Sequence, residues 1–374
     1  MPRSLAYEPR HALNAICPYF TMFPLEYPLR VIAKHRRDRP VVMDPFCGRG
    51  TTLFAARALG LVSRGVDSSP VAVAIAQAKL SFASTDEVLE LARSYIHAGF
   101  KSDIPASPFF ASAYDPGVLR DICAIRHGLL TERSESDVVV LLRAAMLGCL
   151  HGPMSKRPDT QSYFSNQMPR TFASKPDYSV RYWNERGLIA PATNVLQVLR
   201  RKLERIQFEL PPVGATFSNA RLGDSRYAKS LPQNARDFSL VVTSPPYYGM
   251  VTYVQDQWLR NWFLGGPDYV DYANPDQLSH AGKNAFCESL GAVWKNMART
   301  REQDLHMYVR FGIIPSAKAD PKSLMKASLE SSGIRWRLIS TRAAATAASG
   351  KRQANHMAAG STAAIEYDFH ICRI

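Results

Sequence analysis

The stretch Arg39–Leu80 constrains the fold most, because apolar runs alternate there with segments of helical spacing. Residues 40–43 and 61–66 are short, apolar and rich in β-branched side chains. The first run is followed by a glycine loop and helical spacing over 51–59, and the second by a helix that begins near Pro70. Strands that alternate with helices predict a parallel sheet with crossover helices.

A long intervening segment separates this start from further predicted strands. Residues 85–150 are predicted to be mainly helical, 151–183 have no clear period, and 192–208 form another helix. The later strands are predicted at 216–224, 238–244, 305–312, 334–341 and 364–374. The last of these alternates, and we expect it to close the sheet as an edge hairpin. The predicted parts are 1–84 and 216–374 for the sheet domain, and 85–215 for a helical and irregular insert.

The charge balance bears on the partner of the protein rather than on its fold. The 374 residues include 46 Lys and Arg against 32 Asp and Glu, a formal net charge of +14. This excess favours nucleic acid as a partner, and a solubilising surface is the plain alternative. Six scattered cysteines without a CxxC pair favour reduced cytoplasmic thiols and no metal site. No apolar run reaches the ~20 residues that span a membrane, and the N-terminus lacks the apolar core of a signal peptide.

The loop after the first predicted strand is DPFCGRGTT, Asp44–Thr52. Gly48 and Gly50 allow a tight turn that closely approaches a ligand, and the following helix offers unpaired amides. A pyrophosphate cofactor needs the longer GxGxxG pattern, and an acid at the strand end disfavours phosphate. Asp44 suits a cationic ligand instead, and Asp67 after the second strand is placed to bind a ribose diol. For Asp44 the plain alternative is a helix cap in an ordinary turn.

The loop after the predicted strand 238–244 reads Ser244-Pro245-Pro246-Tyr247. The two prolines fix φ and remove backbone donors, so this strand end is stiff. A serine hydroxyl beside a proline carbonyl forms an acceptor pair that fits one exocyclic NH2 group. Tyr247 offers a face on which a base can stack, worth about 1–3 kcal/mol. The pattern predicts a rigid amine-binding site, and a plain strand terminator is the alternative.

These loops resemble motifs of the amino-methyltransferases that act on DNA and use S-adenosyl-L-methionine. DPFCGRGTT is similar to their cofactor motif DPFxGxGTT, and TSPPY to their catalytic motif [DNS]PP[YFW]. Further resemblances follow the family's PYPAKFP, ribose and adenine motifs: CPYFTMFPLEYP at 17–28, GVDSSPVAVAIAQAK at 65–79 and GDSR at 223–226. Position 49 is Arg where relatives often have Ser, and the insert precedes the adenine motif.

The resemblance implies an α/β fold of the class I (Rossmann-like) methyltransferase type, with a seven-stranded, mostly parallel sheet. It implies that the target base is held by Ser244, Pro245, Pro246 and Tyr247. It implies that the cofactor is bound by Tyr19, Phe20, Asp44, Phe46, Gly48, Gly50, Thr51, Asp67, Ser68, Asp224 and Ser225. Asp44 is then expected near the methionine amino group, Asp67 at the ribose and Asp224 at the adenine amine.

Serine in the first position of the catalytic motif is typical of enzymes that methylate cytosine N4. The resemblance therefore implies methyl transfer from S-adenosyl-L-methionine to the exocyclic amine of a flipped base in double-stranded DNA. It also implies the modification half of a restriction–modification system, with a cognate restriction endonuclease as partner. A covalent cytosine-C5 mechanism is excluded, because the chain contains no Pro-Cys dipeptide.

Three alternatives to this function stay open. Adenine-N6 methylation uses the same motifs, usually with Asp or Asn in place of Ser244. Some RNA guanine methyltransferases share the cofactor loop, but they usually carry an added N-terminal domain, whereas the cofactor motif here starts at residue 44. A silent relative that only binds nucleic acid is disfavoured, because it would not need both motifs intact.

The irregular part of the insert is the best candidate for target recognition. Lysine and arginine neutralise phosphates, and arginine and asparagine read base edges. The predicted DNA contacts are Lys156, Arg157, Arg170, Lys175 and Arg181, and the same stretch holds Tyr163, Asn166, Tyr178 and Trp183. The second candidate is the loop 249–280, which contains Trp258. The plain alternative is a solvated excursion that packs on the core.

Overall fold

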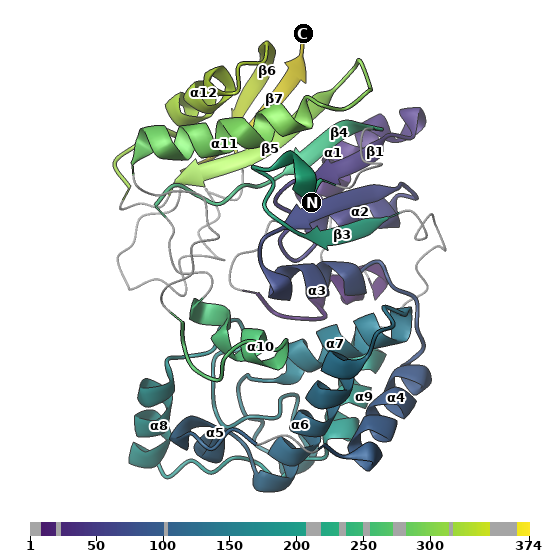
Figure 1. Cartoon of the computed structure of the whole chain (residues 1–374), viewed down its shortest axis with the longest axis vertical. Coiled ribbons are helices and arrows are strands. Elements are labelled where there is room, and N and C mark those ends of the chain that lie inside the picture. Colours follow the sequence, from purple (N-terminus) through teal and green to yellow (C-terminus); the bar gives the residue numbers. More distant parts are fainter. Residues whose placement is uncertain are drawn as a thin grey trace. The chain divides into compact units, whose positions relative to one another are not determined.

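The computed structural model describes residues 9–19, 24–100, 104–206, 218–231, 237–249, 255–271, 282–313, 317–344 and 365–374. The chain divides into two compact units, each described here by itself (Figure 1). The sheet unit comprises Phe23–Ala76, Pro211–Thr252 and Pro275–Ile374. The insert unit comprises Met1–Met22, Gln77–Leu210 and Tyr253–Asn274.

The sheet unit contains one seven-stranded sheet in the order β3-β2-β1-β4-β5-β7-β6. Its strands are β1 Val41–Asp44, β2 Ser63–Asp67, β3 Asn219–Leu222, β4 Phe238–Thr243, β5 His306–Ile313, β6 Trp336–Ala343 and β7 Ile365–Arg373. Strands β1 to β5 pair in parallel, and β7 pairs antiparallel with both β5 and β6. This is the mostly parallel class I methyltransferase sheet, so the predicted fold is confirmed.

Strand β7 does not lie at the sheet edge, where its alternating pattern led us to expect it. It lies between β5 and β6, with Met307 of β5 and Leu338 of β6 both paired to Ile371. The strand at this edge of the sheet is β6, in which Leu338 is 51% exposed, and β3 is at the other edge. Alternation reports that one face of a strand is more buried than the other, and it does not report how many neighbours the strand has.

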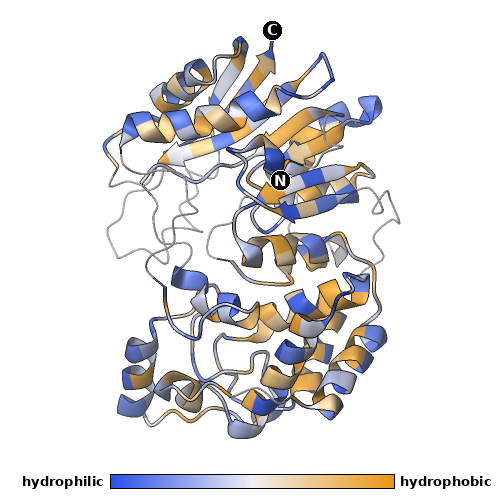
Figure 2. Ribbon diagram, viewed as in Figure 1, coloured by the Kyte–Doolittle hydropathy of each residue, from blue (hydrophilic) through white to orange (hydrophobic). Residues whose placement is uncertain are grey.

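Helices cover the sheet because its strands are too apolar to face water. Strand β4 is buried at Phe238 and over 240–243, and Figure 2 shows the central strands as mainly hydrophobic. On α11, Phe286, Leu290 and Trp294 are fully buried in the core cluster that includes the strand residue Val241. The helices of this unit are α1 Glu26–His35, α2 Thr51–Ala58, α11 Lys283–Met297 and α12 Pro321–Ser331, and α3 Pro70–Ala78 runs from it into the insert unit.

The described part of the insert unit is mainly helical. Its α-helices are α4 Thr85–Ala98, α5 Pro108–Ala113, α6 Pro116–Thr131, α7 Asp137–Cys149, α8 Pro176–Glu185, α9 Val195–Ile206 and α10 Trp258–Phe263. Side chains cap several of them: Ser84 and Glu87 form a capping box at α4, and Asp115 accepts the first amides of α6. The buried residues of α7 include Leu142 and Met146, which accounts for the strongly apolar sequence of this helix.

Besides residues 77–84, two segments outside the predicted insert belong to the insert unit, namely Met1–Met22 and Tyr253–Asn274. Near the N-terminus, the ammonium of Lys79 donates to the Asn14 side chain at 2.9 Å. In the second segment, the guanidinium of Arg260 is fully buried and donates to the Leu147 carbonyl at 3.1 Å and the Arg170 carbonyl at 3.1 Å. Polar contacts that lie far apart in the sequence thus tie both segments to the helices of this unit.

Three features bear on the classes of site that the chain carries. All six cysteines are buried, and none of them forms a disulfide bond. Within the described ranges, no cluster of three or more His, Cys, Asp or Glu side chains is arranged to hold a metal ion. The described helices are all too short or too polar to cross a membrane.

Candidate active site

Four neighbouring strands of the sheet unit place polar residues at their carboxyl ends. Asp44 and Asp67 end β1 and β2, Asp224 follows β3 and Ser244 follows β4. The strand order β3-β2-β1-β4 puts all four ends at one edge of the sheet. In open parallel sheets this edge is where ligands bind. The sequence segments predicted to carry the chemistry therefore meet there.

Asp44 joins the first of these loops to the fourth. Its carboxylate is 2% exposed and accepts a hydrogen bond from the Thr243 hydroxyl at 2.6 Å. It also accepts from the Phe46 amide at 3.1 Å. Burial raises the pKa of Asp44 to about 6, although both hydrogen bonds oppose the shift. These contacts make Asp44 a brace between β1 and β4, and its contact with a methionine amino group stays a prediction.

The two glycines of the loop Asp44–Thr52 differ in how much space a side chain would have. Gly48 and Gly50 have φ values of +49° and +73°. A Cβ at Gly50 would lie 2.7 Å from the Cα of Ala76, so helix packing requires glycine there. Among the described residues, a Cβ at Gly48 would have no neighbour closer than the Phe46 carbonyl at 4.0 Å, so a glycine there leaves space beside the loop. The loop therefore offers room for a ligand at Gly48.

Asp67 fastens this loop from the neighbouring strand. One carboxylate oxygen accepts from the Gly48 amide at 2.9 Å, and the other accepts from the Ser69 amide at 2.9 Å. Burial raises the pKa of Asp67, and the two amides oppose the shift. Ser68 between them is exposed, and Thr51 is buried at the start of α2. A carboxylate with four lone-pair positions can still accept from a diol.

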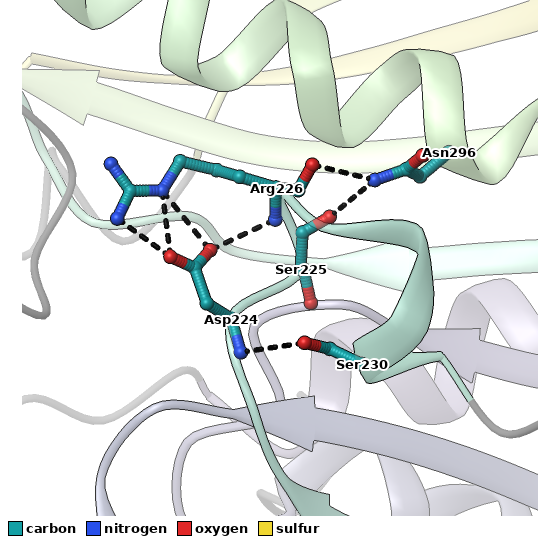
Figure 3. A network of polar contacts seen from close by, with 5 residues as sticks. All are labelled: Asp224, Ser225, Arg226, Ser230 and Asn296. Atoms are coloured by element: carbon teal, nitrogen blue, oxygen red, sulfur yellow. Dashed lines mark hydrogen bonds and ion pairs between the residues drawn. The ribbon is translucent and has the colours of Figure 1, made fainter.

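Asp224 is held by a residue of its own turn (Figure 3). The Arg226 guanidinium donates from Nη2 to Oδ2 at 2.6 Å and from Nε to both carboxylate oxygens at 2.8 and 3.0 Å. The Arg226 amide donates to Oδ1 at 2.9 Å, and the Asp224 amide donates to the Ser230 hydroxyl. Much of the acceptor capacity of Asp224 is therefore occupied within the protein.

The same turn is tied to the glycine loop and to α11. The buried Ser225 hydroxyl donates to the Pro45 carbonyl at 2.7 Å. The Asn296 side chain donates to the carbonyls of Ser225 and Arg226, each at 2.9 Å (Figure 3). No sequence motif marks Asn296, because a single asparagine within an apolar helix pattern gives no sign of its contacts. Ser225 thus serves the described structure as a link between β1 and β3.

The Ser244–Tyr247 loop continues directly from the residue that bonds Asp44. Ser244 is half-buried, and within the described residues its hydroxyl has no hydrogen-bond partner. Pro245 is buried and Pro246 is half-buried. Tyr247 is 8% exposed and its hydroxyl donates to the carboxylate of Glu366 on β7. The serine is therefore the accessible polar group of the loop.

Two further candidates for cofactor binding lie near the N-terminus. Tyr19 is 8% exposed and belongs to the insert unit, whereas the other described candidates belong to the sheet unit. Phe20 lies outside the described residues. Phe46 is half-buried and meets Trp294 edge-on, with ring centroids 6.4 Å apart.

The five predicted DNA contacts are all exposed in the insert unit: Lys156, Arg157, Arg170, Lys175 and Arg181. Asn166 and Trp183, which lie in the same stretch, are instead buried, with 0% and 1% of their side chains exposed. Asn166 donates to the carbonyls of Ser112 and Leu188, and Trp183 donates to the Gln167 carbonyl at 2.8 Å. Both side chains hold the irregular segment together instead of facing a partner.

The second recognition candidate also has a buried residue at its centre. Trp258 is 3% exposed and donates from Nε1 to the Ser174 carbonyl at 3.1 Å. Its ring meets that of Phe109 edge-on, with centroids 4.7 Å apart. Trp258 therefore supports residues 151–183, the basic segment that carries the predicted DNA contacts, from within the insert unit.

Residues 4–78 match the N6/N4 DNA methylase family. The matched segment includes the glycine loop and Asp67, which confirms the predicted resemblance over this part of the chain. No curated protein sequence shows significant similarity to the chain. The match supports a methyltransferase, and this family implies S-adenosyl-L-methionine as the methyl donor.

The solved structures that are similar to the chain include the following two. The rRNA methyltransferase AviRa from Streptomyces viridochromogenes is 13% identical with a TM-score of 0.33, over 99% of this chain and 95% of that one. The YcgJ protein from Bacillus subtilis is 8% identical with a TM-score of 0.31, over 93% of this chain and 98% of that one.

The residues present fit the implied cofactor. A sulfonium with an adenosine needs space beside a turn, an acid for hydroxyl groups and no phosphate-binding cradle. The open position at Gly48 supplies the space, and the Asp67 carboxylate supplies the acid at the neighbouring strand end.

Proposed function

We propose that this protein is an S-adenosyl-L-methionine-dependent DNA methyltransferase that modifies the exocyclic amine of a flipped base, cytosine N4 in the first instance. The observation that carries the proposal is the hydrogen bond between Thr243 and Asp44. It joins two strand ends from which the cofactor loop and the Ser244–Tyr247 loop depart. A methyl donor and an amine acceptor must meet within a few ångströms, and neighbouring strand ends satisfy this requirement.

The protein's part in the reaction is to bind and orient. When bound, S-adenosyl-L-methionine supplies an electrophilic methyl group on a sulfonium. Gly48, Gly50 and Asp67 would hold it, with Asp67 at the ribose hydroxyls. The hydroxyl of Ser244 and the carbonyl of Pro245 would accept the two hydrogens of the amine.

Acceptance of these hydrogens is what makes the amine reactive. The lone pair of an aromatic amine is delocalised into the ring, so the amine is a weak nucleophile. Two acceptors that draw its hydrogens out of the ring plane localise the lone pair toward the methyl group. The half-buried Ser244, which has no hydroxyl partner in the described part of the chain, suits this role.

Double-stranded DNA is the proposed substrate, and a cognate restriction endonuclease is the proposed partner in the cell. The five predicted DNA contacts, which are exposed basic residues of the insert unit, support binding to a polyanion. A flipped base costs a few kcal/mol to extrude from the duplex, and phosphate contacts offset this cost. Sequence preference would then come from side chains of the same segment.

Methylation of duplex DNA with a labelled cofactor tests the proposal directly. The full chain is incubated with duplex DNA, with single-stranded DNA and with RNA, and the modified nucleoside is identified by mass spectrometry. We expect N4-methylcytosine from the duplex alone. N6-methyladenine would replace the cytosine assignment, and label in RNA alone would overturn the DNA assignment.

A pair of serine variants ties the reaction to the loop. Ser244→Ala removes one of the two acceptors, and we expect kcat to fall by on the order of 100-fold while cofactor affinity is unchanged. The matched control is Ser94→Ala, which alters an exposed hydroxyl of α4 that donates to the Leu91 carbonyl. Equal activity of the two variants would remove Ser244 from the mechanism.

A further inference from the structure

The hydroxyl of Tyr247, in the loop after β4, is hydrogen-bonded to an acid of β7, which is separated from β4 in the sheet by β5 alone. It donates to the carboxylate of Glu366, which lies on β7 at the position opposite Gly312 of β5. A hydrogen bond to an ionised carboxylate is roughly twice as strong as one between neutral groups. Gly312, directly opposite Glu366, has no side chain and so leaves space beside this carboxylate.

The other acid of this strand is engaged elsewhere. Asp368 pairs with Arg310 through two hydrogen bonds of 2.7 and 2.8 Å, in register across β5 and β7. Arg310 in turn lies over the ring of Tyr27 at 4.2 Å. The two acids of β7 are therefore divided between different partners, and Glu366 is the one that reaches the loop after β4.

The ring of Tyr247 is also held in place, by contacts with other aromatic rings. Its ring meets Phe311 edge-on, with centroids 6.4 Å apart, and Phe311 stacks on Phe286 at 6.0 Å. The next residue, Tyr248, meets the other end of this pair, with its ring edge-on to Phe286 at 5.2 Å. A bridge between Tyr248 and Ile313 fixes the backbone there.

We infer that Glu366 is a positioning residue, which sets the orientation of the Tyr247 ring at the target-base site through the phenolic hydroxyl. The inference rests on the proposed function for the meaning of that site, but the contact itself does not. The hydrogen bond to Glu366 holds the phenolic oxygen and thereby fixes rotation of Tyr247 about its Cα–Cβ bond. The edge-on contact with Phe311 restricts rotation of the ring about the Cβ–Cγ bond, so together the two contacts leave the ring one orientation. A base that stacks against a fixed ring meets the acceptors at Ser244 and Pro245 without a further search.

A double-variant cycle tests the inference. The variants are Tyr247→Phe, Glu366→Ala and their combination, assayed for kcat and KM on DNA and for cofactor affinity by calorimetry. We expect each single variant to lower kcat about tenfold, and the combination to lower it by the same factor, because both remove one interaction. Cofactor affinity should stay within about twofold of the parent, because neither residue lies in the glycine loop.

A conservative variant and a control separate positioning from general stability. Glu366→Gln keeps an acceptor oxygen, and we expect it to retain kcat within about threefold. The control Glu330→Ala removes an exposed acid of α12 that pairs with Lys326 at 3.8 Å, and should leave kcat unchanged. Losses that multiply in the combined variant, or a Glu366→Ala enzyme with full activity, would overturn the inference.

Thermal unfolding keeps the two proposals distinguishable. If the parent protein methylates no nucleic acid, the proposed function fails, and the cycle is then read from unfolding midpoints alone. Midpoint shifts that do not add show that Tyr247 and Glu366 act as one unit, which upholds the positioning contact. Midpoint shifts that add overturn it.

Discussion

The strand-end loops of the sheet unit and the basic segment of the insert unit differ in what their charged side chains contact. Asp44, Asp67 and Asp224 all accept hydrogen bonds from protein groups. Lys156 and Arg181 are exposed, on a segment whose backbone is held from within. This difference has a physical reason. Methyl transfer requires that the reacting groups are held in a fixed geometry, whereas binding of a polyanion needs only charged side chains on an ordered backbone.

The backbone of the basic segment is held in place by hydrogen bonds from other residues of the insert unit. Arg260 donates to the carbonyls of Arg170 and Thr171, and to the Gln257 side chain at 2.6 Å. Gln257 donates to the Thr171 carbonyl as well, and the Ala173 amide donates to the Asp256 carbonyl. Residues 255–263, which follow the Ser244–Tyr247 loop in the sequence, thus order the backbone that carries the predicted DNA contacts.

The largest effect should come from removal of this support. Arg260→Met leaves buried carbonyls without donors, and we expect the insert unit to lose about 4 kcal/mol of stability. Urea unfolding measures the loss, and Arg93→Met at an exposed position of α4 is the control. A loss of stability similar to that of the control would show that Arg260 does not hold the backbone of the basic segment.

The next effect is a pH dependence confined to the strand-end loops. Burial raises the pKa of Asp44 to about 6 from an ordinary value of 3.8, so the folded state holds this proton more tightly than the unfolded state. Ionisation therefore costs stability as pH rises from about 4 to about 6, on the order of 3 kcal/mol. Relative to Asp44→Asn, the parent should become less stable over this range and level off above it.

Denaturant unfolding of both proteins at several pH values measures this difference. The other titrating groups are common to the two proteins, and their contributions cancel in the comparison. A stability difference that stays constant from pH 4 to pH 7 would mean that Asp44 titrates normally, and that the link between β1 and β4 does not bury a charge.

A third, smaller effect distinguishes two acids of the same site. Asp67 fastens the Gly48 amide, whereas Asp224 is held by Arg226. We expect Asp67→Ala to weaken cofactor binding about 30-fold, and Asp224→Asn about threefold, because much of the acceptor capacity of Asp224 is already occupied. Calorimetry with the cofactor measures both, and DNA affinity should be unchanged in both. The reverse order would show that the Arg226 pair opens when the cofactor binds.

The sequence predicted the sheet unit well because its information is local. Strands β1 and β2, the loops between them and helix α2 lie within a few residues of the predicted bounds. Glycines, prolines and acids at strand ends are recognisable where they stand. The seven-stranded, mostly parallel sheet followed from the family resemblance, and the inner position of β7 did not follow from alternation.

Contacts that join distant segments were beyond the sequence. Glu366 meets Tyr247 across 119 positions, and Asn296 meets Ser225 across 71. The same limit applies to the burial of Asn166 and Trp183, because a polar or aromatic residue in a stretch without a clear sequence period gives no sign of its burial. The exposed basic residues were found correctly as exposed only because charge is seldom buried without a partner.

The smallest effects concern those exposed residues, and they test the other half of the comparison. Arg157→Gln and Arg181→Gln should each weaken DNA binding about threefold to tenfold, with cofactor affinity unchanged. If each residue neutralises one phosphate, each variant should also reduce the slope of log affinity against log salt by about 0.9. Arg93→Gln on α4 serves as the control for net charge. An equal loss in the control would indicate attraction by overall charge, whereas a selective loss with an altered sequence preference would mean that the residue reads a base edge.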